Sequence, residues 1–222
     1  MLIEIVSDLV CPWCYIGQRR LDRALHHDGA PAPRLLWRAF QLNPDMPPDG
    51  VPRQAYLAAK FGGTFHADRI YQAIGEAGAA EGIGFRFDRI LRTPNSLNAH
   101  RLKRHARRHR AEPDVTERLY RAYFEEARDI GLAGVLADIA AEAGLERAEA
   151  LRYLASDEDR LAVQAEDISA RRQGINGVPC VVIDGKYALS GAQEPVFFLP
   201  LFDLARQDRV QSVAQDAHAM TP

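Results

Sequence analysis

The strongest constraint on the fold is the motif Cys11-Pro12-Trp13-Cys14, which stands between a predicted strand and a predicted helix. The strand covers residues 2–7, which are mostly apolar and β-branched. The helix begins at Pro12, a position where the missing N–H of proline costs nothing. Cys11 therefore occupies the N-cap, beside unpaired backbone N–H groups and the positive end of the helix dipole.

This position of the motif favours redox chemistry. The thiolate is the reactive form of cysteine, and a helix N-terminus stabilises it. Cys14 lies one turn further into the helix, within disulfide reach of Cys11 and less exposed. The pattern predicts Cys11 as the attacking sulfur and Cys14 as the resolving sulfur.

The cysteine pair has two other possible interpretations, half of a zinc site and a pair of unreactive structural cysteines. Two cysteines at this spacing form half of many zinc sites, but a four-ligand site needs a second pair. Cys180 is the only other cysteine, and His26 and His27 are adjacent rather than spaced as paired ligands. We therefore expect no metal. A pair of unreactive structural cysteines is disfavoured by the strand–motif–helix context.

The length, the apolar runs, the net charge and the N-terminal pattern of the chain limit the classes of protein to which it can belong. A chain of 222 residues can form one large domain, or one domain with a second one inserted. No apolar run approaches 18 residues, so no membrane span is expected, and a net charge of −2 gives no global attraction to nucleic acid or anionic membranes. Met1 leads directly into the first strand without a signal-peptide pattern, so we expect a cytoplasmic protein, where cysteines favour redox chemistry over structural disulfides.

Residues 34–40 read as a second strand, which completes a β-α-β unit with parallel strands. A proline-rich segment at 43–50 then leaves the sheet. Helical periodicity dominates from about residue 52 to 173, which is too long for a crossover connection. We predict an inserted, all-helical subdomain over residues 46–173.

β-structure returns after this insertion. Asp184-Gly185 lies between two apolar runs in residues 177–189 and predicts a hairpin with a type I′ turn. A last helix is expected over residues 195–206. The α/β fold is thus β-α-β, a helical insertion, and β-β-α, with residues 1–45 and 174–207 forming one domain. The polar residues 208–222 are expected to form a disordered tail.

A dense basic run covers the predicted helix 97–110, with six Lys or Arg residues and three histidines. Such a run is typical of phosphate or nucleic-acid binding. The charges spread around most of the helix and acidic residues are plentiful nearby, so a solvated, ion-paired face is the favoured interpretation and no nucleic acid is expected as a partner.

The element order and several motifs resemble the thioredoxin fold, more narrowly the DsbA family with its helical insertion, and within it the cytosolic FrnE-like branch. The matching stretches span residues 8–193, nearly the whole chain. They are Asp8-x-x-Cys11-Pro12-Trp13-Cys14-Tyr15-Ile16-Gly17, Leu42-Asn43-Pro44-Asp45-Met46, Thr93-Pro94-Asn95, Ala99-His100-Arg101-Leu102, Gly177-Val178-Pro179 and Leu189-Ser190-Gly191-Ala192-Gln193.

The resemblance implies that Pro179 is a cis-proline that faces the dithiol. It would leave the Val178 backbone available to pair with a substrate strand, and Pro12 and Trp13 would form an apolar platform for the substrate. Cys180 departs from the family pattern. Because neighbours in a strand face opposite sides, Cys180 is expected to point into the core, with a third redox thiol as the alternative.

Three further residues are weaker candidates for the site. The insertion caps the active site in relatives, so Asn95 and His100 are expected near the dithiol, where a histidine could tune Cys11 or shuttle a proton. A structural hydrogen bond is an equal alternative for each. Asp8 either assists catalysis or caps the local turn.

The resemblance implies a thiol–disulfide oxidoreductase, acting as oxidase, isomerase or reductase on disulfide- or thiol-bearing proteins or small thiols. It needs no cofactor beyond the Cys11–Cys14 disulfide, with glutathione a candidate co-substrate. The alternative is a glutathione-dependent transferase or isomerase of the kappa-class or hydroxychromene-carboxylate isomerase type. These have serine in place of the leading cysteine, which weighs against this alternative. A partner-binding role for the basic helix ranks third, and a homodimer contact through the insertion stays open.

Overall fold

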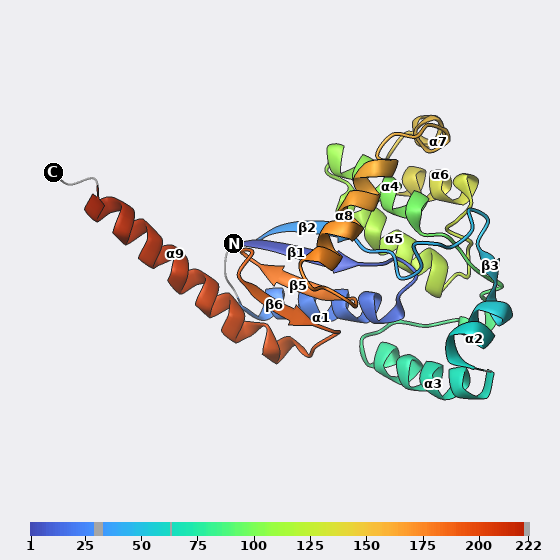
Figure 1. The fold of residues 1–222 in the computed structure, drawn as a ribbon, viewed down its shortest axis with the longest axis horizontal. Coiled ribbons are helices and arrows are strands. Elements are labelled where there is room, and N and C mark those ends of the chain that lie inside the picture. Colours follow the sequence, from blue (N-terminus) through green and yellow to red (C-terminus); the bar gives the residue numbers. More distant parts are fainter. Residues whose placement is uncertain (29–32, 63, 220–222) are drawn as a thin grey trace.

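A four-stranded sheet organises the first and last parts of the chain (Figure 1). The computed structural model describes residues 1–28, 33–62 and 64–219. The strand order is β2-β1-β5-β6, with β1 and β2 parallel and the other neighbours antiparallel. The strands are β1 (Leu2–Ser7), β2 (Arg34–Ala39), β5 (Cys180–Ile183) and β6 (Tyr187–Ser190). This is the predicted thioredoxin-like arrangement.

Helices cover both faces of this sheet. Successive side chains of β1 point to opposite faces, and apolar residues of β1 lie on both. Ile3 and Ile5 share one apolar cluster with residues of α1 (Pro12–Asp28) and α9 (Leu199–Ala219). Val6 instead packs near Ala170 of α8. The parallel pair β1–β2 is therefore covered by helices on both faces.

The segment between β2 and β5 forms a second body beside the C-terminal end of β1 (Figure 1). Its helices are α2 (Arg53–Phe61), α3 (Thr64–Ala80), α4 (Leu97–Arg108), α5 (Glu112–Phe124), α6 (Ala133–Glu142), α7 (Arg147–Ala155) and α8 (Arg160–Arg172), with a 3₁₀ turn η1 at Phe87–Arg89. The largest apolar cluster of the described residues joins α4 to α7 with Leu9, Cys14 and Ile16. The first turn of α1 is thus part of the core of the insertion.

The insertion is not all-helical, which corrects the prediction. β3 (Val51–Pro52) and β4 (Arg92–Thr93) form a small antiparallel ladder. Two-residue strands are too short to show a period, and their pairing joins positions about forty residues apart. Such a ladder is formed by tertiary contacts rather than by local propensity.

The C-terminal tail is also different from the prediction. Helix α9 continues through residue 208 to Ala219, and residues 220–222 lie outside the described part of the chain. Polarity suggested disorder, but there is no Gly or Pro before Pro222 to end the helix. Asp208 accepts hydrogen bonds from Lys186 Nζ (2.5 Å) and Tyr187 Oη (2.8 Å), which attaches the helix to the β5–β6 hairpin.

The turn of this hairpin has the predicted type I′ geometry. Asp184 and Gly185 have φ values of 49° and 67°, and the Lys186 N–H donates to the Ile183 carbonyl at 3.0 Å. Positive φ at both central residues is what a type I′ turn requires. Asp–Gly meets this requirement because both residue types tolerate left-handed backbone.

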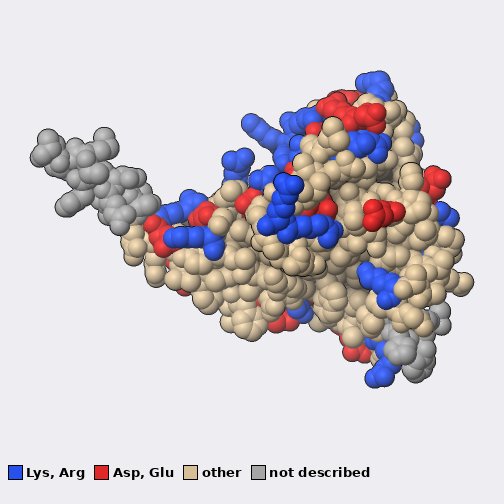
Figure 2. All heavy atoms as spheres, in the orientation of Figure 1, with Lys and Arg blue, Asp and Glu red and all other residues tan. Residues whose placement is uncertain are grey.

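Helix α4 is only partly the solvated face that was predicted. Arg104, Arg107 and Arg108 do form ion pairs with acidic side chains. On the face shown in Figure 2, Lys and Arg likewise lie beside Asp and Glu. Arg101 and Lys103, however, are buried.

The described helices include none that is long and apolar enough to cross a membrane.

Arg101 has a structural role in the insertion. Its guanidinium donates to the carbonyls of Leu154 (3.2 Å) and Tyr153 (2.9 Å) in the last turn of α7, and to those of Ser156 (2.7 Å) and Glu158 (2.8 Å) beyond it. The last carbonyls of a helix lack partners within the helix, so this buried cation caps α7.

We predict that Arg101→Met lowers the free energy of unfolding by about 3 kcal/mol or more, because four carbonyls near the buried guanidinium lose their donor. Urea unfolding followed by circular dichroism measures this. Arg172→Met, at an exposed position at the end of α8, is the control and should change stability little. Equal stability of the two variants would contradict the capping role.

Candidate active site

The two cysteines of the motif lie where β1 ends and α1 begins. The Cys11 N–H donates to the Asp8 carbonyl (3.2 Å), and the Cys14 N–H donates to the Cys11 carbonyl (3.0 Å). Both sulfurs are free thiols in this structure, and the residues are 4% and 2% exposed. Cys11 is thus held just before the first residue of α1, as the sequence predicts.

The surroundings of Cys14 keep it in the thiol form. Burial raises the pKa of Cys14 well above its usual value, and its hydrogen bond with Cys11 and the negative charges of Cys11 and Asp8 raise it further. A hydrogen bond with the Asp8 backbone acts in the opposite direction. Cys14 therefore needs a proton acceptor before it can act as a nucleophile.

Pro179 lies beside the dithiol, and the Val178–Pro179 peptide bond is cis. The Cys11 Sγ is 3.7 Å from the Val178 carbonyl oxygen, although 167 positions separate these residues in the sequence. The Pro179 carbonyl accepts from the Gly191 N–H at 2.8 Å. The resemblance placed these two residues at the dithiol, and the geometry brings them together.

An open hollow of about 540 Å³ runs along this segment. It is lined by Gln173, Gly174, Ile175, Asn176, Gly177, Val178, Pro179, Cys180, Ala188, Ser190 and Gly191. Within the motif, Trp13 is 38% exposed and Pro12 is half-buried. The motif thus carries an exposed ring, and a hollow runs along the cis-proline segment.

Gly17 permits the close approach of Pro179 to α1. A Cβ added at Gly17 would lie 2.9 Å from the Pro179 Cγ and 3.5 Å from the Ala192 Cα. A larger residue at position 17 would push the proline segment away from the first turn of α1. This contact explains why a glycine follows the motif by three residues.

Asp8 and His100 form a buried pair next to the dithiol. The Asp8 Oδ1 is 3.3 Å from the His100 Nε2, and its Oδ2 accepts from the Leu42 N–H at 2.7 Å. Asp8 and His100 are 0% and 1% exposed. His100 comes from α4, so the insertion supplies a polar group beside Asp8.

Two residues near Cys14 were missed by sequence reasoning. The Tyr120 hydroxyl lies 3.4 Å from the Asp8 carbonyl, and the pKa of Tyr120 is raised by burial and then by the charge of Cys14. Lys103 is 2% exposed, and its Nζ has no hydrogen-bond partner among the described residues. Burial lowers the pKa of Lys103 to about 8, while nearby negative groups, including Cys14, act against this.

A signal for Lys103 was present in the sequence. It lies three residues after His100 and directly after Leu102, within the apolar stripe of Ala99, Leu102 and Ala106. A lysine within an apolar stripe indicates a buried amine. No comparable signal marks Tyr120, because aromatic residues are common in helix cores.

Tyr15, the residue after Cys14, fastens α1 to α5. Its ring stacks on Tyr120, with centroids 5.0 Å apart and an interplanar angle of 9°. Its hydroxyl donates to the Glu125 carboxylate at 2.7 Å and contacts Glu117, which also pairs with Arg19. These contacts hold the first turn of α1 against the insertion.

The remaining predicted residues have structural surroundings. The Asn95 side chain donates to the Met46 carbonyl (2.6 Å) and accepts from the Leu97 N–H (2.9 Å), so its described bonds join the segment after β2 to the start of α4. Cys180 is buried in a small apolar cluster with Val6, and burial raises the pKa of its thiol. The orientation of Cys180 toward the core agrees with strand alternation.

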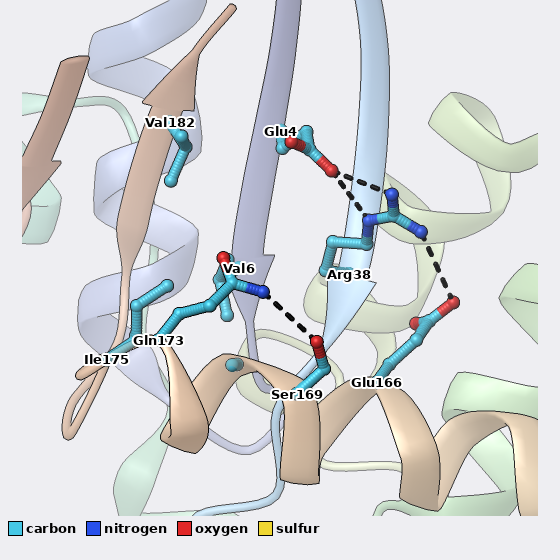
Figure 3. A pocket seen from close by; sticks show the side chains of 9 residues that line it. Glu4, Val6, Arg38, Glu166, Ser169, Gln173, Ile175 and Val182 are labelled. Carbon is cyan, nitrogen blue, oxygen red and sulfur yellow. Dashed lines mark hydrogen bonds and ion pairs between the residues drawn. The ribbon is translucent and has the colours of Figure 1, made fainter. Parts of the chain in front are cut away.

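A separate cavity of about 200 Å³ lies between the sheet and α8 (Figure 3). Arg38 bridges Glu4 (2.8 Å) and Glu166 (4.0 Å) in this cavity, and Gln173 donates to Ser169 at 3.0 Å. Neither Cys11 nor Cys14 lines it. The charged side chains of this cavity are already paired with one another. The dithiol is therefore the better candidate for the active site.

Comparison with known proteins agrees with this fold. The model of the DSBA-like thioredoxin domain matches residues 2–202, so the chain belongs to this family. A probable DsbA oxidoreductase from Streptomyces coelicolor is 31% identical, with a TM-score of 0.83 over 93% of this chain and 90% of that chain. The family consists of thiol–disulfide oxidoreductases and isomerases, and this chain is an enzyme of that class.

Two further structures are similar in fold at lower identity. The cytosolic disulfide reductase DsbM from Pseudomonas aeruginosa, solved with GSH, is 17% identical, with a TM-score of 0.64 over 96% of this chain and 100% of that chain. A 2-hydroxychromene-2-carboxylate isomerase is 15% identical, with a TM-score of 0.62 over 97% of this chain and 98% of that chain. At such identities the likeness shows a shared fold.

We predict that Gly17→Ala lowers the free energy of unfolding by about 1–3 kcal/mol, because the new methyl group overlaps the Pro179 ring. Thermal or urea unfolding measures this. Gly75→Ala is the matched control, since Gly75 lies in α3 with nothing within 4 Å of an added Cβ, and it should be neutral or stabilising. A Gly17→Ala variant as stable as Gly75→Ala would contradict the contact.

Proposed function

We propose that the chain catalyses thiol–disulfide exchange with Cys11 as nucleophile and Cys14 as resolving cysteine. The Cys11 thiolate attacks a substrate disulfide, forms a mixed disulfide and releases one substrate thiolate. The Cys14 thiolate then attacks the Cys11 sulfur, releases the second substrate thiolate and leaves the Cys11–Cys14 disulfide. The reverse sequence oxidises a substrate dithiol.

The observation that carries this proposal is the position of Cys11, which stands at the start of α1 with its Sγ 3.7 Å from the Val178 carbonyl. Backbone N–H groups and the positive end of the helix dipole lie at this position. The backbone of Val178 is available for strand-like pairing with a substrate, and Pro12 and Trp13 offer apolar surface within the motif. Nucleophile and substrate-binding backbone are therefore adjacent.

We predict that Cys11→Ser abolishes insulin reduction and the reactivation of scrambled ribonuclease, because no nucleophile remains. Cys14→Ser should accumulate a mixed disulfide at Cys11, which mass spectrometry under non-reducing conditions detects. Cys180→Ala is the control and should keep the wild-type rate, since Cys180 is buried in the core. Turnover that survives in Cys11→Ser, or that is lost in Cys180→Ala, would contradict the assignment.

We further propose that Asp8, aided by His100, accepts the Cys14 proton when the mixed disulfide is resolved. The raised pKa of Cys14 makes an acceptor necessary. Asp8 contacts Cys14 through its backbone and places its carboxylate beside His100, in surroundings without solvent. A positive charge on buried Lys103 would favour the Cys14 thiolate once it forms.

We predict that Asp8→Asn slows resolution of the mixed disulfide by about 10²-fold near neutral pH, the usual contribution of a positioned base. Without the acceptor, the rate should follow spontaneous ionisation of Cys14 and rise steadily with pH, because its raised pKa leaves little thiolate. Stopped-flow decay of a Cys11-linked substrate measures this.

The control for this experiment is Asp114→Asn, at an exposed position in the first turn of α5. It should keep the wild-type rate and pH profile. An Asp8→Asn variant with the wild-type profile would remove Asp8 from the proton path, even if its stability is reduced.

Glutathione is the small-thiol partner that we propose, together with a reducing, cytoplasmic setting of the FrnE-like type. The support is the structural likeness to a cytosolic disulfide reductase that was solved with GSH. A redox titration of the Cys11–Cys14 pair against glutathione decides between oxidant, isomerase and reductant. Glutathione conjugation or isomerisation that persists in Cys14→Ser would favour the alternative transferase or isomerase class.

A further inference from the structure

A cluster of metal-ligating side chains lies away from the dithiol, where α4 meets α7. His105 is in the last turn of α4, and His109 is the residue that caps its C-terminus. Glu149 is in the first turn of α7. The His105 Nε2 and the His109 Nε2 are each 3.8 Å from the Glu149 Oε1, and the three ligand atoms all lie within 4.8 Å of one another.

The spacing of the two histidines produces this convergence. Residues four apart lie one above the other on a helix, so both imidazoles face the same side. Their ring centroids are 4.9 Å apart. Neighbouring ligands in a tetrahedral zinc site are about 3.3 Å apart, given zinc–ligand distances of about 2.0–2.2 Å. The half-exposed Glu149 side chain needs only a small shift to close the site.

His105 is the buried member of the cluster, and it faces Glu149 with its Nε2. Its side chain is 6% exposed, and its Nδ1 has no hydrogen-bond partner among the described residues. Its Nε2 is too far from Glu149 for a hydrogen bond. Tyr153 stacks on the ring at 4.6 Å and holds it in place. A buried imidazole without a short polar contact is costly unless something binds it.

We propose that His105, His109 and Glu149 bind a divalent transition-metal ion such as Zn²⁺. Two imidazole nitrogens and one carboxylate suit Zn²⁺, Ni²⁺ or Co²⁺, whereas Mg²⁺ and Ca²⁺ prefer oxygen ligands. The fourth position faces an open hollow of about 280 Å³ and takes water or a small ligand. This site shares no residue with the dithiol, so it does not depend on the proposed redox function.

The charges around the cluster are compatible with a cation. Arg108 lines the hollow but is neutralised by Glu158 and Asp159. Arg152 also lines it and is exposed, so water screens its charge. Neutral imidazole nitrogens and an ionised carboxylate are the forms that bind a metal ion.

A metal ion bound by these three side chains would link α4 to α7. Helix α4 carries His100 and Lys103 on its buried side, and Arg101 of α4 already caps the end of α7. A metal at the opposite end of α7 would fix the two helices at a second point. The bound ion therefore stabilises the insertion that covers the active site, without contact with the reacting sulfurs.

The test is Zn²⁺ titration by calorimetry on the full-length chain without a histidine tag, first oxidised with diamide so that Cys11 and Cys14 are joined and cannot bind metal. We expect one ion per chain. His109→Ala and Glu149→Gln, both at partly exposed positions, should weaken binding by at least about tenfold. Zinc should raise the thermal unfolding midpoint of the wild type more than that of either variant.

His26→Ala and Glu146→Gln are the matched controls, since both residues are exposed and lie outside the cluster. They should bind zinc like the wild type. Co²⁺ in place of Zn²⁺ should give weak visible bands without a sulfur charge-transfer band. The proposal is overturned if the wild type binds no zinc, if His109→Ala and Glu149→Gln bind it as the wild type does, or if cobalt shows sulfur ligation.

Discussion

The packing of the first turn of α1 into the core of the insertion is the contact on which the site depends. Leu9, Cys14 and Ile16 belong to the same apolar cluster as α4 to α7, although the sheet to which α1 is attached has its own core. Tyr15 adds a stacked ring and carboxylate hydrogen bonds to α5. The dithiol therefore lies between two bodies, and its burial, its polar neighbours and its access to substrate all follow from that position.

The two cysteines differ in their neighbours at this junction, although both are buried. Cys11 lies just before α1 with its Sγ beside the Val178 carbonyl, whereas burial and the nearby charges of Cys11 and Asp8 raise the pKa of Cys14. Polar groups are stable in a core only when they are paired. Asp8, which follows β1, and His100 of α4 form such a pair beside the dithiol. The insertion thus contributes a polar side chain to the surroundings of the site.

The same helix shows where sequence reasoning succeeded and where it failed. The element order, the type I′ turn and the position of Cys11 were predictable because they depend on local rules: a strand period, a positive-φ dipeptide and a helix start. The burial of Arg101 and Lys103 was not, because a basic run normally faces solvent and only the neighbouring helices decide otherwise. The β3–β4 ladder and the helical residues after 207 were missed for similar reasons, since long-range pairing and attachment to the hairpin set them.

The sequence by itself determined the chemistry at the start of α1: two cysteines one turn apart after a strand, with the first at the N-cap. The position of Pro179 beside the dithiol was predicted only from the family resemblance, because no local sequence pattern links Cys11 to Val178. Tertiary structure decided which groups surround the sulfurs, because the antiparallel pairing of β5 with β1 brings Val178 to Cys11 and the packing of α4 brings His100 to Asp8. It also decided that His105, His109 and Glu149 converge, since the two histidines are one helical turn apart by sequence and the glutamate reaches them only through the contact of α4 with α7.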